Sequence, residues 1–363
     1  MVLSISGCWG DGNSGGFSSQ EDGVFYRPKA IALQADAAGE AVRLFVVNDD
    51  DSLTSCGLQP DGSMAACSNR KNPHLAAVNH VAIHPGTQTL LFDQAAGASL
   101  TSCALDAGLG LAACQPSTDG GAIQDARSVA FNASGRQAYV VLADSRVVRC
   151  AVAGNGVLQS CATVPLPGGL GRPATLRLLA TASGEYAYLL NSGGDASISV
   201  CTVSPSTGNF ERCVAERGNG VFTAPSSMTF NPARSHAYIA NADTNSIAIC
   251  GVSATGGLVS CRNSDGEGTF AAVSALSFDP AGKRAYAANA LNSTISVCTV
   301  ASQGGDLNAC SVFTIEDFEY TTDMVIGTRQ GGLIAYIVSF SNGAVYGCPL
   351  DKAGEFTSCA STE

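Results

Sequence analysis

The cysteines of this chain recur at a regular interval, and this periodicity constrains the fold more than any other feature. Fourteen of the 15 cysteines form seven pairs whose members lie 11 or 12 positions apart. The first members of successive pairs are 47, 47, 51, 49, 48 and 50 residues apart, a repeat length typical of propeller blades. The seven pairs are Cys56–Cys67, Cys103–Cys114, Cys150–Cys161, Cys201–Cys213, Cys250–Cys261, Cys298–Cys310 and Cys348–Cys359.

The spacing within each pair predicts disulfide bonds rather than metal sites. Zinc sites usually present Cys-x-x-Cys, which this sequence lacks. A longer gap suits two cysteines that face each other across a β-hairpin, and each bond then closes a short loop worth no more than about 3 kcal/mol. Disulfides persist in oxidising compartments, so we expect a secreted, periplasmic or cell-surface protein.

Each repeat contains four short strands separated by turns. In the clearest copy, apolar runs occupy residues 225–230, 237–241, 246–250 and 258–261. Short runs bounded by Gly, Pro, Asn and Asp are typical of strands and turns, and repeated four-stranded sheets close radially into a β-propeller with short, protected edges. We therefore predict an all-β, seven-bladed propeller with one disulfide per blade. It would form a single domain over residues 28–363, preceded by an N-terminal segment over residues 1–27.

The second strand of the repeat carries the motif Ala-Tyr-x-x-Asn, as at residues 187–191, 237–241 and 285–289, followed by segments such as Ser-Ile-Ser-Val. From about Phe25 to Cys359, this pattern resembles the YVTN-type repeats of lactonase-like and surface-layer propellers. The resemblance implies the seven-bladed fold. The family that it resembles includes sugar-lactone hydrolases and binding proteins, so the resemblance implies one of these functions. The paired cysteines depart from the cytoplasmic lactonases and argue against their metabolic role.

The charge balance argues against a nucleic-acid partner. The chain has 19 Lys and Arg against 30 Asp and Glu, a net charge of −11, whereas binding to phosphates needs a basic stripe. The longest apolar runs fall far short of the roughly 20 residues that a membrane-spanning helix needs. We therefore expect a monomer without a transmembrane segment, whose partner is a small molecule or a protein at the mouth of the central channel.

The first strand of each blade lies nearest the channel, and its side chains alternate in direction. Large residues such as Met228 and Phe230 are predicted to pack between blades, which leaves the intervening positions to face the channel. The small members of this channel set include Ala30, Ala32, Ala82, Ala130 and Ala275. The members that are not small are His80, Arg177 and Asp323.

Basic residues near the starts of these strands predict an anion site, because guanidinium groups bind carboxylates through two hydrogen bonds. The predicted ligand-binding residues are Lys29, Asn79, His80, Arg127, Arg172, Arg177 and Asp323. An alternative for Arg177 is a structural ion pair with Asp323. The alternative for His80 is a satisfied position in the core.

Two kinds of function fit this site. The first is a binding module for a small polar or saccharide-like ligand or for a protein partner. The second is an enzyme at the same mouth, either a lactone hydrolase or a sugar lyase. A lyase would need a base, for which His80 and Asp323 are the candidates, and an arginine to stabilise the developing negative charge.

No motif requires a cofactor or a resident metal, although carboxylates at residues 49–51 and 316–319 offer an alternative Ca²⁺ site. The N-terminus raises a separate question, because Ile5-Ser-Gly-Cys8 matches the fourth-strand pattern of residues 258–261. This segment could pair with the last blade in competition with residues 355–361. A lipoprotein-processing role for Cys8 is the alternative, although only six residues precede Gly7.

Overall fold

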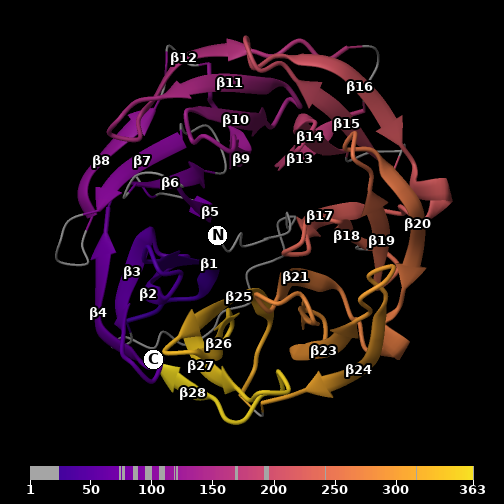
Figure 1. The fold of residues 1–363 in the computed structure, drawn as a ribbon. Helices are drawn as coiled ribbons and strands as arrows, with labels where there is room; N and C mark the ends of the chain where they lie inside the picture. Colours follow the sequence, from indigo (N-terminus) through magenta and orange to yellow (C-terminus); the bar gives the residue numbers. More distant parts are fainter. Residues whose placement is uncertain are drawn as a thin grey trace.

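The computed structural model describes residues 24–72, 75, 78–84, 89–94, 100–105, 111–117, 119, 122–167, 171–191, 196–241, 243–315 and 317–362. These residues form seven antiparallel sheets of four strands each. Figure 1 shows the sheets arranged radially around a common centre. The predicted seven-bladed propeller is confirmed.

Blade 1 contains β1 (Pro28–Ala35), β2 (Ala41–Asn48), β3 (Ser52–Leu58) and β4 (Met64–Lys71). Blade 2 contains β5 (Val78–Ile83), β6 (Thr89–Gln94), β7 (Leu100–Leu105) and β8 (Leu111–Ser117). Blade 3 contains β9 (Ala126–Phe131), β10 (Gln137–Leu142), β11 (Val147–Val152) and β12 (Leu158–Thr163). Blade 4 contains β13 (Pro173–Thr181), β14 (Gly184–Asn191), β15 (Ser197–Val203) and β16 (Phe210–Glu216).

Blade 5 contains β17 (Pro225–Phe230), β18 (His236–Asn241), β19 (Ser246–Val252) and β20 (Leu258–Ser264). Blade 6 contains β21 (Val273–Phe278), β22 (Arg284–Asn289), β23 (Thr294–Val300) and β24 (Leu307–Phe313). Blade 7 contains β25 (Thr321–Arg329), β26 (Gly332–Ser339), β27 (Ala344–Leu350) and β28 (Ala360–Thr362). Two short 3-10 turns, η3 (Gly218–Gly220) and η4 (Gly266–Gly268), lie between blades.

In each blade the chain runs from the innermost to the outermost strand through antiparallel neighbours. One end of every sheet therefore carries the start of the first strand, the end of the second, the start of the third and the end of the fourth. In blade 1, Pro28 at the start of β1 pairs with Asn48 at the end of β2. Ser52 at the start of β3 pairs with Lys71 at the end of β4. We call the face of the ring that carries these ends, and their counterparts in the other blades, the mouth face. The hairpins between third and fourth strands lie on the opposite face.

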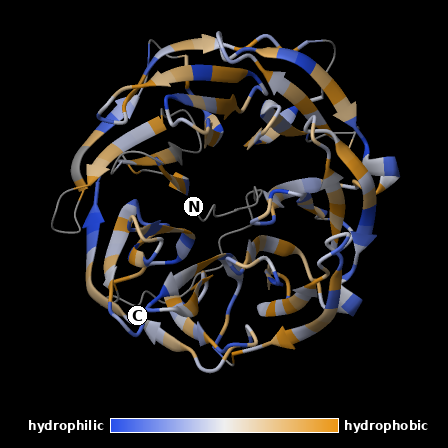
Figure 2. Cartoon of the chain, viewed as in Figure 1, coloured by the Kyte–Doolittle hydropathy of each residue, from blue (hydrophilic) through white to orange (hydrophobic). Residues whose placement is uncertain are grey.

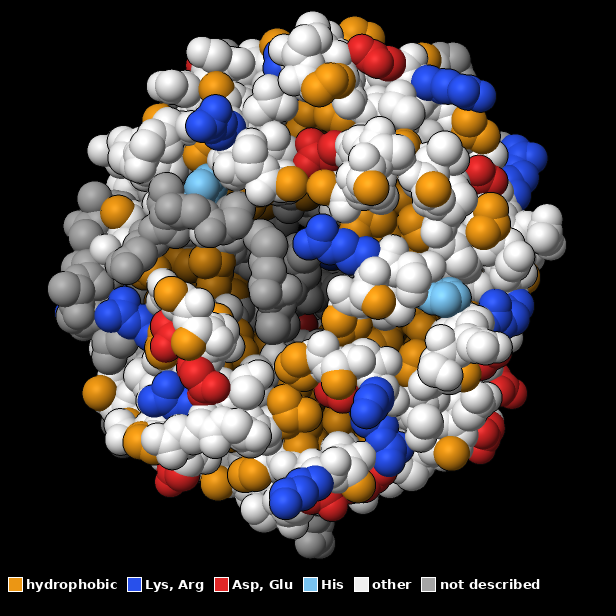
Figure 3. Space-filling view, viewed as in Figure 1, with side chains coloured by type: hydrophobic (Ala, Val, Ile, Leu, Met, Phe, Trp, Pro, Cys, Tyr) orange, Lys and Arg blue, Asp and Glu red, His pale blue; other side chains and the backbone are white. Residues whose placement is uncertain are grey.

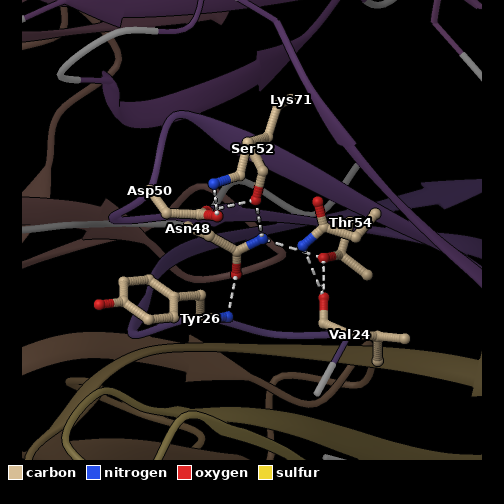
Figure 4. Close-up of polar contacts among 8 residues, drawn as sticks. Val24, Tyr26, Asn48, Asp50, Ser52, Thr54 and Lys71 are labelled. Atoms are coloured by element: carbon tan, nitrogen blue, oxygen red, sulfur yellow. Dashed lines mark hydrogen bonds and ion pairs between the residues drawn. The ribbon is translucent and has the colours of Figure 1, made fainter. Parts of the chain in front are cut away.

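The asparagine that ends the second strand, in blade 1 and in the blades with the Ala-Tyr-x-x-Asn motif, connects three segments on the mouth face. The Asn48 amide nitrogen donates to two hydroxyl groups of β3, each at 2.9 Å, and its Oδ1 accepts from the backbone N–H of Tyr26 at 3.2 Å (Figure 4). Asn241 and Asn289 make corresponding bonds in blades 5 and 6. The motif therefore ties the chain entering a blade to the turn between its second and third strands.

The tyrosine of the same motif connects neighbouring blades on the opposite face. The buried Tyr238 hydroxyl donates to the Gly305 carbonyl oxygen of the next blade at 2.8 Å. The same contact recurs at 2.6–2.8 Å in the pairs Tyr139–Gly208, Tyr188–Gly256, Tyr286–Gly354 and Tyr336–Gly62. Burial raises the pKa of all five hydroxyls above the ordinary value. They therefore remain protonated donors at neutral pH.

All seven predicted disulfides are present, and each connects the third strand of a blade to the chain of its fourth strand or just before it, with Cα–Cα distances of 4.0–4.2 Å. The first cysteine of every pair is buried among apolar side chains. The second is partly exposed. Each bond thus fastens the outermost strand, which has a neighbour on one side only, to the packed interior.

The side chains of the innermost strands pack between blades in both directions, so the predicted channel lining is wrong for Ala30, Ala32, Ala130 and Ala275. Ala30 and Ala32 lie in the core shared by blades 1 and 2, whereas Ile31 lies in the core shared by blades 7 and 1. Ala130 and Ala275 also lie in cores between blades. The reason is geometric: both faces of a blade meet a neighbouring blade, and only the edge of its first strand faces the channel. Figure 2 shows hydrophobic residues throughout the strands of the ring.

Blade 7 takes all four strands from the C-terminal part of the chain, and β28 pairs with β27. Cys348 is bonded to Cys359, while Cys8 and the predicted pairing of residues 5–8 lie outside the described residues. Blades 7 and 1 meet through polar contacts in addition to their shared core. Arg329 donates at 2.8 Å to the carbonyl oxygens of Leu58 and Gln59.

Candidate functional site

The residues predicted to bind a ligand lie in or next to the innermost strands of blades 1 to 4 and of blade 7. Lys29 belongs to β1, Asn79 and His80 to β5, Arg127 to β9, Arg177 to β13 and Asp323 to β25, while Arg172 directly precedes β13. The Asn79 side chain lies outside the described part of the chain. Figure 3 shows the centre of the ring as a hollow with a Lys or Arg side chain beside it.

Two arginines lie near the starts of the first strands of the neighbouring blades 3 and 4. Arg127 is the second residue of β9, Arg172 directly precedes β13, and both side chains are exposed. The two strands are joined by Ser128, whose Oγ lies 3.0 Å from Thr175 Oγ1 and accepts from Leu176 N at 3.3 Å. We call Arg127 and Arg172 the arginine pair. Arg127 makes no ion pair with any residue that the structure describes.

Lys29 differs from Arg127 because its charge is compensated by a described carboxylate. Its Nζ forms an ion pair with Asp49, and Arg27 Nη1 lies 3.1 Å from the other oxygen of the same carboxylate. The next carboxylate, Asp50, is 3.1 Å from Lys71 Nζ. Asp49 and Asp50 of the acidic run therefore serve local ion pairs.

The alternative Ca²⁺ site gains no support from this arrangement. Among the described residues, no group of three or more His, Cys, Asp or Glu side chains is placed to hold a metal ion. In the second acidic run, Asp317 and Glu319 are exposed. Glu316 lies outside the described residues.

Arg177 reaches backbone groups rather than open space. Its Nε donates to the carbonyl oxygen of Met228 in blade 5 at 3.2 Å, and its Nη1 donates to the Leu176 carbonyl oxygen at 3.0 Å. The Ser277 hydroxyl occupies the same repeat position in blade 6 and donates to the Met324 carbonyl oxygen at 3.0 Å. Arg177 therefore makes, with a longer side chain, the same kind of contact to the next blade that Ser277 makes in blade 6.

Asp323 likewise connects two blades. Its side chain is completely buried, and its carboxylate accepts from the backbone N–H of Ile31 in blade 1 at 3.1 Å and from Met324 N at 2.8 Å. Blades 5 and 6 lie between its strand and that of Arg177. This placement gives Asp323 a role in holding the ring together. A catalytic role for it stays a prediction.

His80 is half-buried on β5, in register with Asp93 of β6. The other two described histidines lie near turns away from the mouth face. His84 is buried and its Nε2 lies 2.6 Å from the Gly135 carbonyl oxygen. Burial lowers the pKa of His236 below the ordinary value. His80 is therefore the one described histidine that belongs to the start of a first strand.

A feature that sequence reasoning missed is an open, polar hollow of about 480 Å³ between blades 5 and 6. It is lined by Ser246, Asn263, Ser264, Asp265, Asp306, Leu307 and Asn308. Its carboxylates have partners nearby: Asp306 pairs with Arg262, and Asp265 Oδ1 accepts from the Glu267 N–H at 3.0 Å. The hollow therefore presents satisfied groups, and we assign it no ligand.

Sequence reasoning also missed three aromatic residues on the mouth face of blades 7 and 1. They are Tyr26, Tyr320 and Phe340. The Tyr26 side chain is 40% exposed, and the rings of Tyr320 and Phe340 are paired with their centroids 6.1 Å apart. Aligning the repeats at the residue after the second strand would have revealed Phe340, because blades 3, 5 and 6 carry alanine there.

Comparison with known proteins supports the fold at low sequence identity. No protein-family pattern matches the sequence, and no curated protein sequence matches it. Among solved structures, a periplasmic gluconolactonase from Pseudomonas aeruginosa is 15% identical with a TM-score of 0.61, covering 92% of this chain and 95% of the other. A candidate 6-phosphogluconolactonase from Bacteroides fragilis is 14% identical with a TM-score of 0.65, covering 89% and 95%.

A hydrazine synthase from Kuenenia stuttgartiensis is similar to the same degree, with 12% identity, a TM-score of 0.63 and coverage of 95% and 100%. The same architecture thus hosts different chemistries, and fold alone does not decide function. The chain is a seven-bladed β-propeller that resembles the lactonase-like propellers. Its seven disulfides indicate an oxidising compartment outside the cytoplasm.

Proposed function

We propose that this protein is an exported propeller that binds a small, anionic, saccharide-like ligand on its mouth face. The observation that carries the proposal is the arginine pair. Two exposed guanidinium groups stand at neighbouring strand starts in a chain with a net charge of −11. One of them makes no ion pair with the described residues.

The repeat itself supports a role in binding rather than folding for this pair. At the position of Arg127, blades 5 and 6 carry Ser226 and Ser274, and at the position of Arg172 blade 6 carries Ala272. The blades therefore fold with small residues at both places. Guanidinium groups bind carboxylates and phosphates through paired, charge-assisted hydrogen bonds worth about 1.5–3 kcal/mol each.

Hydrolysis of a sugar lactone is the second candidate function, and the likeness to a periplasmic gluconolactonase favours it. In that reaction His80 would accept a proton from a water molecule as the water oxygen attacks the lactone carbonyl carbon. An arginine of the pair would stabilise the oxyanion that forms. The bond between the carbonyl carbon and the ring oxygen then breaks, and the ring oxygen takes up the proton.

The test uses D-gluconate as the binding probe and D-glucono-1,5-lactone as the substrate probe. Titration calorimetry should show gluconate binding that weakens about tenfold or more in Arg127→Ser and Arg172→Ala, as the loss of a charge-assisted contact requires. Arg212→Ser, an exposed arginine of outer strand β16, is the matched control and should bind normally. Equal binding by all variants would overturn the site.

Lactone hydrolysis is followed separately by proton release. His80→Ala should abolish it and leave gluconate affinity within about twofold, since a general base is needed for the chemical step only. If the unmodified protein binds gluconate but does not hydrolyse the lactone, the binding function stands and the proposed lactonase activity is wrong. The exported location is tested by cell fractionation, and recovery of the protein from the cytoplasm with free thiols would contradict it.

A further inference from the structure

Blade 7 carries aromatic residues at two positions of the mouth face where other blades carry alanine. Phe340 follows the last residue of β26, where the corresponding residues of blades 3, 5 and 6 are Ala143, Ala242 and Ala290. Tyr320 directly precedes β25, where blade 6 has Ala272. The fold therefore does not need an aromatic side chain at either position.

The backbone at these positions supports the same conclusion. Tyr320 has a φ of 57°, in the left-handed region that a bulky residue rarely adopts, and its alanine counterpart Ala272 has a φ of 48°. Arg27, directly before β1, also has a positive φ of 43°. The turn conformation is thus a property of the repeat, and blade 7 places a tyrosine on a turn that alanine adopts elsewhere.

The aromatic side chains and their charged neighbours form a partly exposed group. The Phe340 ring meets the Tyr320 ring at an interplanar angle of 65°, and the Arg27 guanidinium lies 4.4 Å from the Phe340 centroid. The Arg27 side chain is 47% exposed and shares Asp49 with Lys29. The Tyr26 ring points away from the Asn48 network (Figure 4).

Tyr26 is exposed, and Tyr320 and Phe340 are partly exposed. Aromatic side chains on a protein surface are enriched at binding interfaces, because they combine a large apolar area with, in tyrosine, a polar hydroxyl group. An aromatic ring face carries partial negative charge and attracts the weakly positive C–H groups on one side of a pyranose ring. The flanking Arg27, Lys29 and Asp49 supply hydrogen-bond donors and acceptors for sugar hydroxyl groups. Neutral saccharides match both features.

We propose that Tyr26, Tyr320 and Phe340 form a stacking subsite for the pyranose ring of a neutral oligosaccharide, with Arg27 holding the Phe340 ring in place and bonding to sugar hydroxyls. This subsite goes beyond the proposed function and does not depend on it, because it lies at the junction of blades 7 and 1 whereas the arginine pair lies at blades 3 and 4.

The experiment titrates the full chain with cellohexaose, chitohexaose and xylohexaose in a calorimeter. At least one of them should bind, and Phe340→Ala and Tyr320→Ala should each weaken that binding by about tenfold, which corresponds to about 1.4 kcal/mol, because each removes a ring that stacks on the sugar. Both variants introduce the residue that other blades carry, so they should fold. The control is Leu291→Ala, which removes an exposed apolar side chain, 73% accessible, from the turn after β22.

Several results would overturn the subsite. These are no binding of any of the three oligosaccharides at millimolar concentration, an equal loss in Leu291→Ala, or capture of an unstructured peptide library that Phe340→Ala abolishes without any saccharide binding. Gluconate titration separates this failure from failure of the proposed function. Phe340→Ala should leave gluconate affinity unchanged, and Arg127→Ser should leave oligosaccharide affinity unchanged.

Discussion

The two faces of the ring use the same repeat in different ways. On the face opposite the mouth, the same contact joins blade to blade five times: a buried tyrosine hydroxyl donates to a glycine carbonyl oxygen of the next blade. On the mouth face, equivalent positions hold different residues in different blades. The residue directly before the first strand is Arg27 in blade 1, Arg172 in blade 4, Ala272 in blade 6 and Tyr320 in blade 7.

This difference separates the residues that hold the ring together from those available for function. Blades 1 and 2 carry Phe45 and Leu91 in place of this tyrosine, but in the five blades that have it the hydroxyl satisfies a buried carbonyl oxygen, so its removal there should cost stability. A position that accepts alanine in one blade and arginine or tyrosine in another is not needed for folding. The variation on the mouth face is therefore where binding properties should be sought.

The largest expected effect is loss of stability at alkaline pH. Burial raises the pKa of Tyr139, Tyr188, Tyr238, Tyr286 and Tyr336. Their contribution is complete below the unfolded-state pKa of about 10 and falls as pH rises above it, by up to about 1.4 kcal/mol per pH unit for each group. Five groups together should remove several kcal/mol by about pH 11, which urea unfolding at increasing pH would measure.

Substitution identifies the groups responsible for this alkaline loss. A Tyr286→Phe variant should show a shallower decline above pH 10, because one titrating hydroxyl is gone. Tyr26→Phe on the mouth face should decline as steeply as the unmodified chain, since Tyr26 is exposed. Identical profiles for Tyr286→Phe and the unmodified chain would mean that the buried tyrosines do not govern alkaline unfolding.

The second largest effect is expected from removing one disulfide. Replacing Cys250 and Cys261 together with alanine should lower the free energy of unfolding by about 3 kcal/mol, the value expected for a loop of this length. The pair fastens an outer strand with a neighbour on one side only, so hydrogen exchange should rise first along β20. Exchange that rises equally in all seven blades would show that the bond stabilises the ring as a whole.

Much of this fold could be predicted from the sequence because the repeat states the same information seven times. The spacing of Cys250 and Cys261 predicted a hairpin, and the turns between apolar runs predicted four strands. The predicted channel set failed for Ala30 and Ala130, because alternation along a strand shows only that two faces exist. Which surface each face meets depends on how the blades are arranged around the ring.

The candidate site was predictable in part for the same reason. Arg127 and Arg172 could be placed at strand starts from the turn pattern, and the structure leaves both exposed. The partners of Arg177 and Asp323 could not be predicted, because they are backbone groups of neighbouring blades, 51 and 292 residues away in sequence at the interblade contacts. No local pattern in the sequence marks a backbone atom as a partner.

A smaller effect is expected from a single hydroxyl on the face opposite the mouth. Tyr286→Phe at neutral pH should cost about 1–2 kcal/mol, since it leaves the Gly354 carbonyl oxygen buried without its donor. Thermal or urea unfolding measures this loss. Tyr26→Phe is the control on the mouth face and should change stability by less than about 0.5 kcal/mol. If both variants lose a similar amount of unfolding free energy, the two faces do not differ in their contribution to stability.

The smallest expected effect on stability comes from converting the mouth face of blade 7 to the pattern of blade 6. The double variant Tyr320→Ala with Phe340→Ala gives blade 7 the alanines that blade 6 carries as Ala272 and Ala290. Both aromatic side chains are partly exposed, and alanine already adopts a φ of 48° at Ala272. The loss of one partly exposed ring pair and of the Arg27 contact should therefore lower the free energy of unfolding by only about 1 kcal/mol or less, while oligosaccharide binding is lost. Unfolding curves and calorimetric titration of the same preparation measure both quantities. A loss of several kcal/mol would mean that these rings are needed to stabilise the fold. The mouth face would then contribute to stability as the opposite face does.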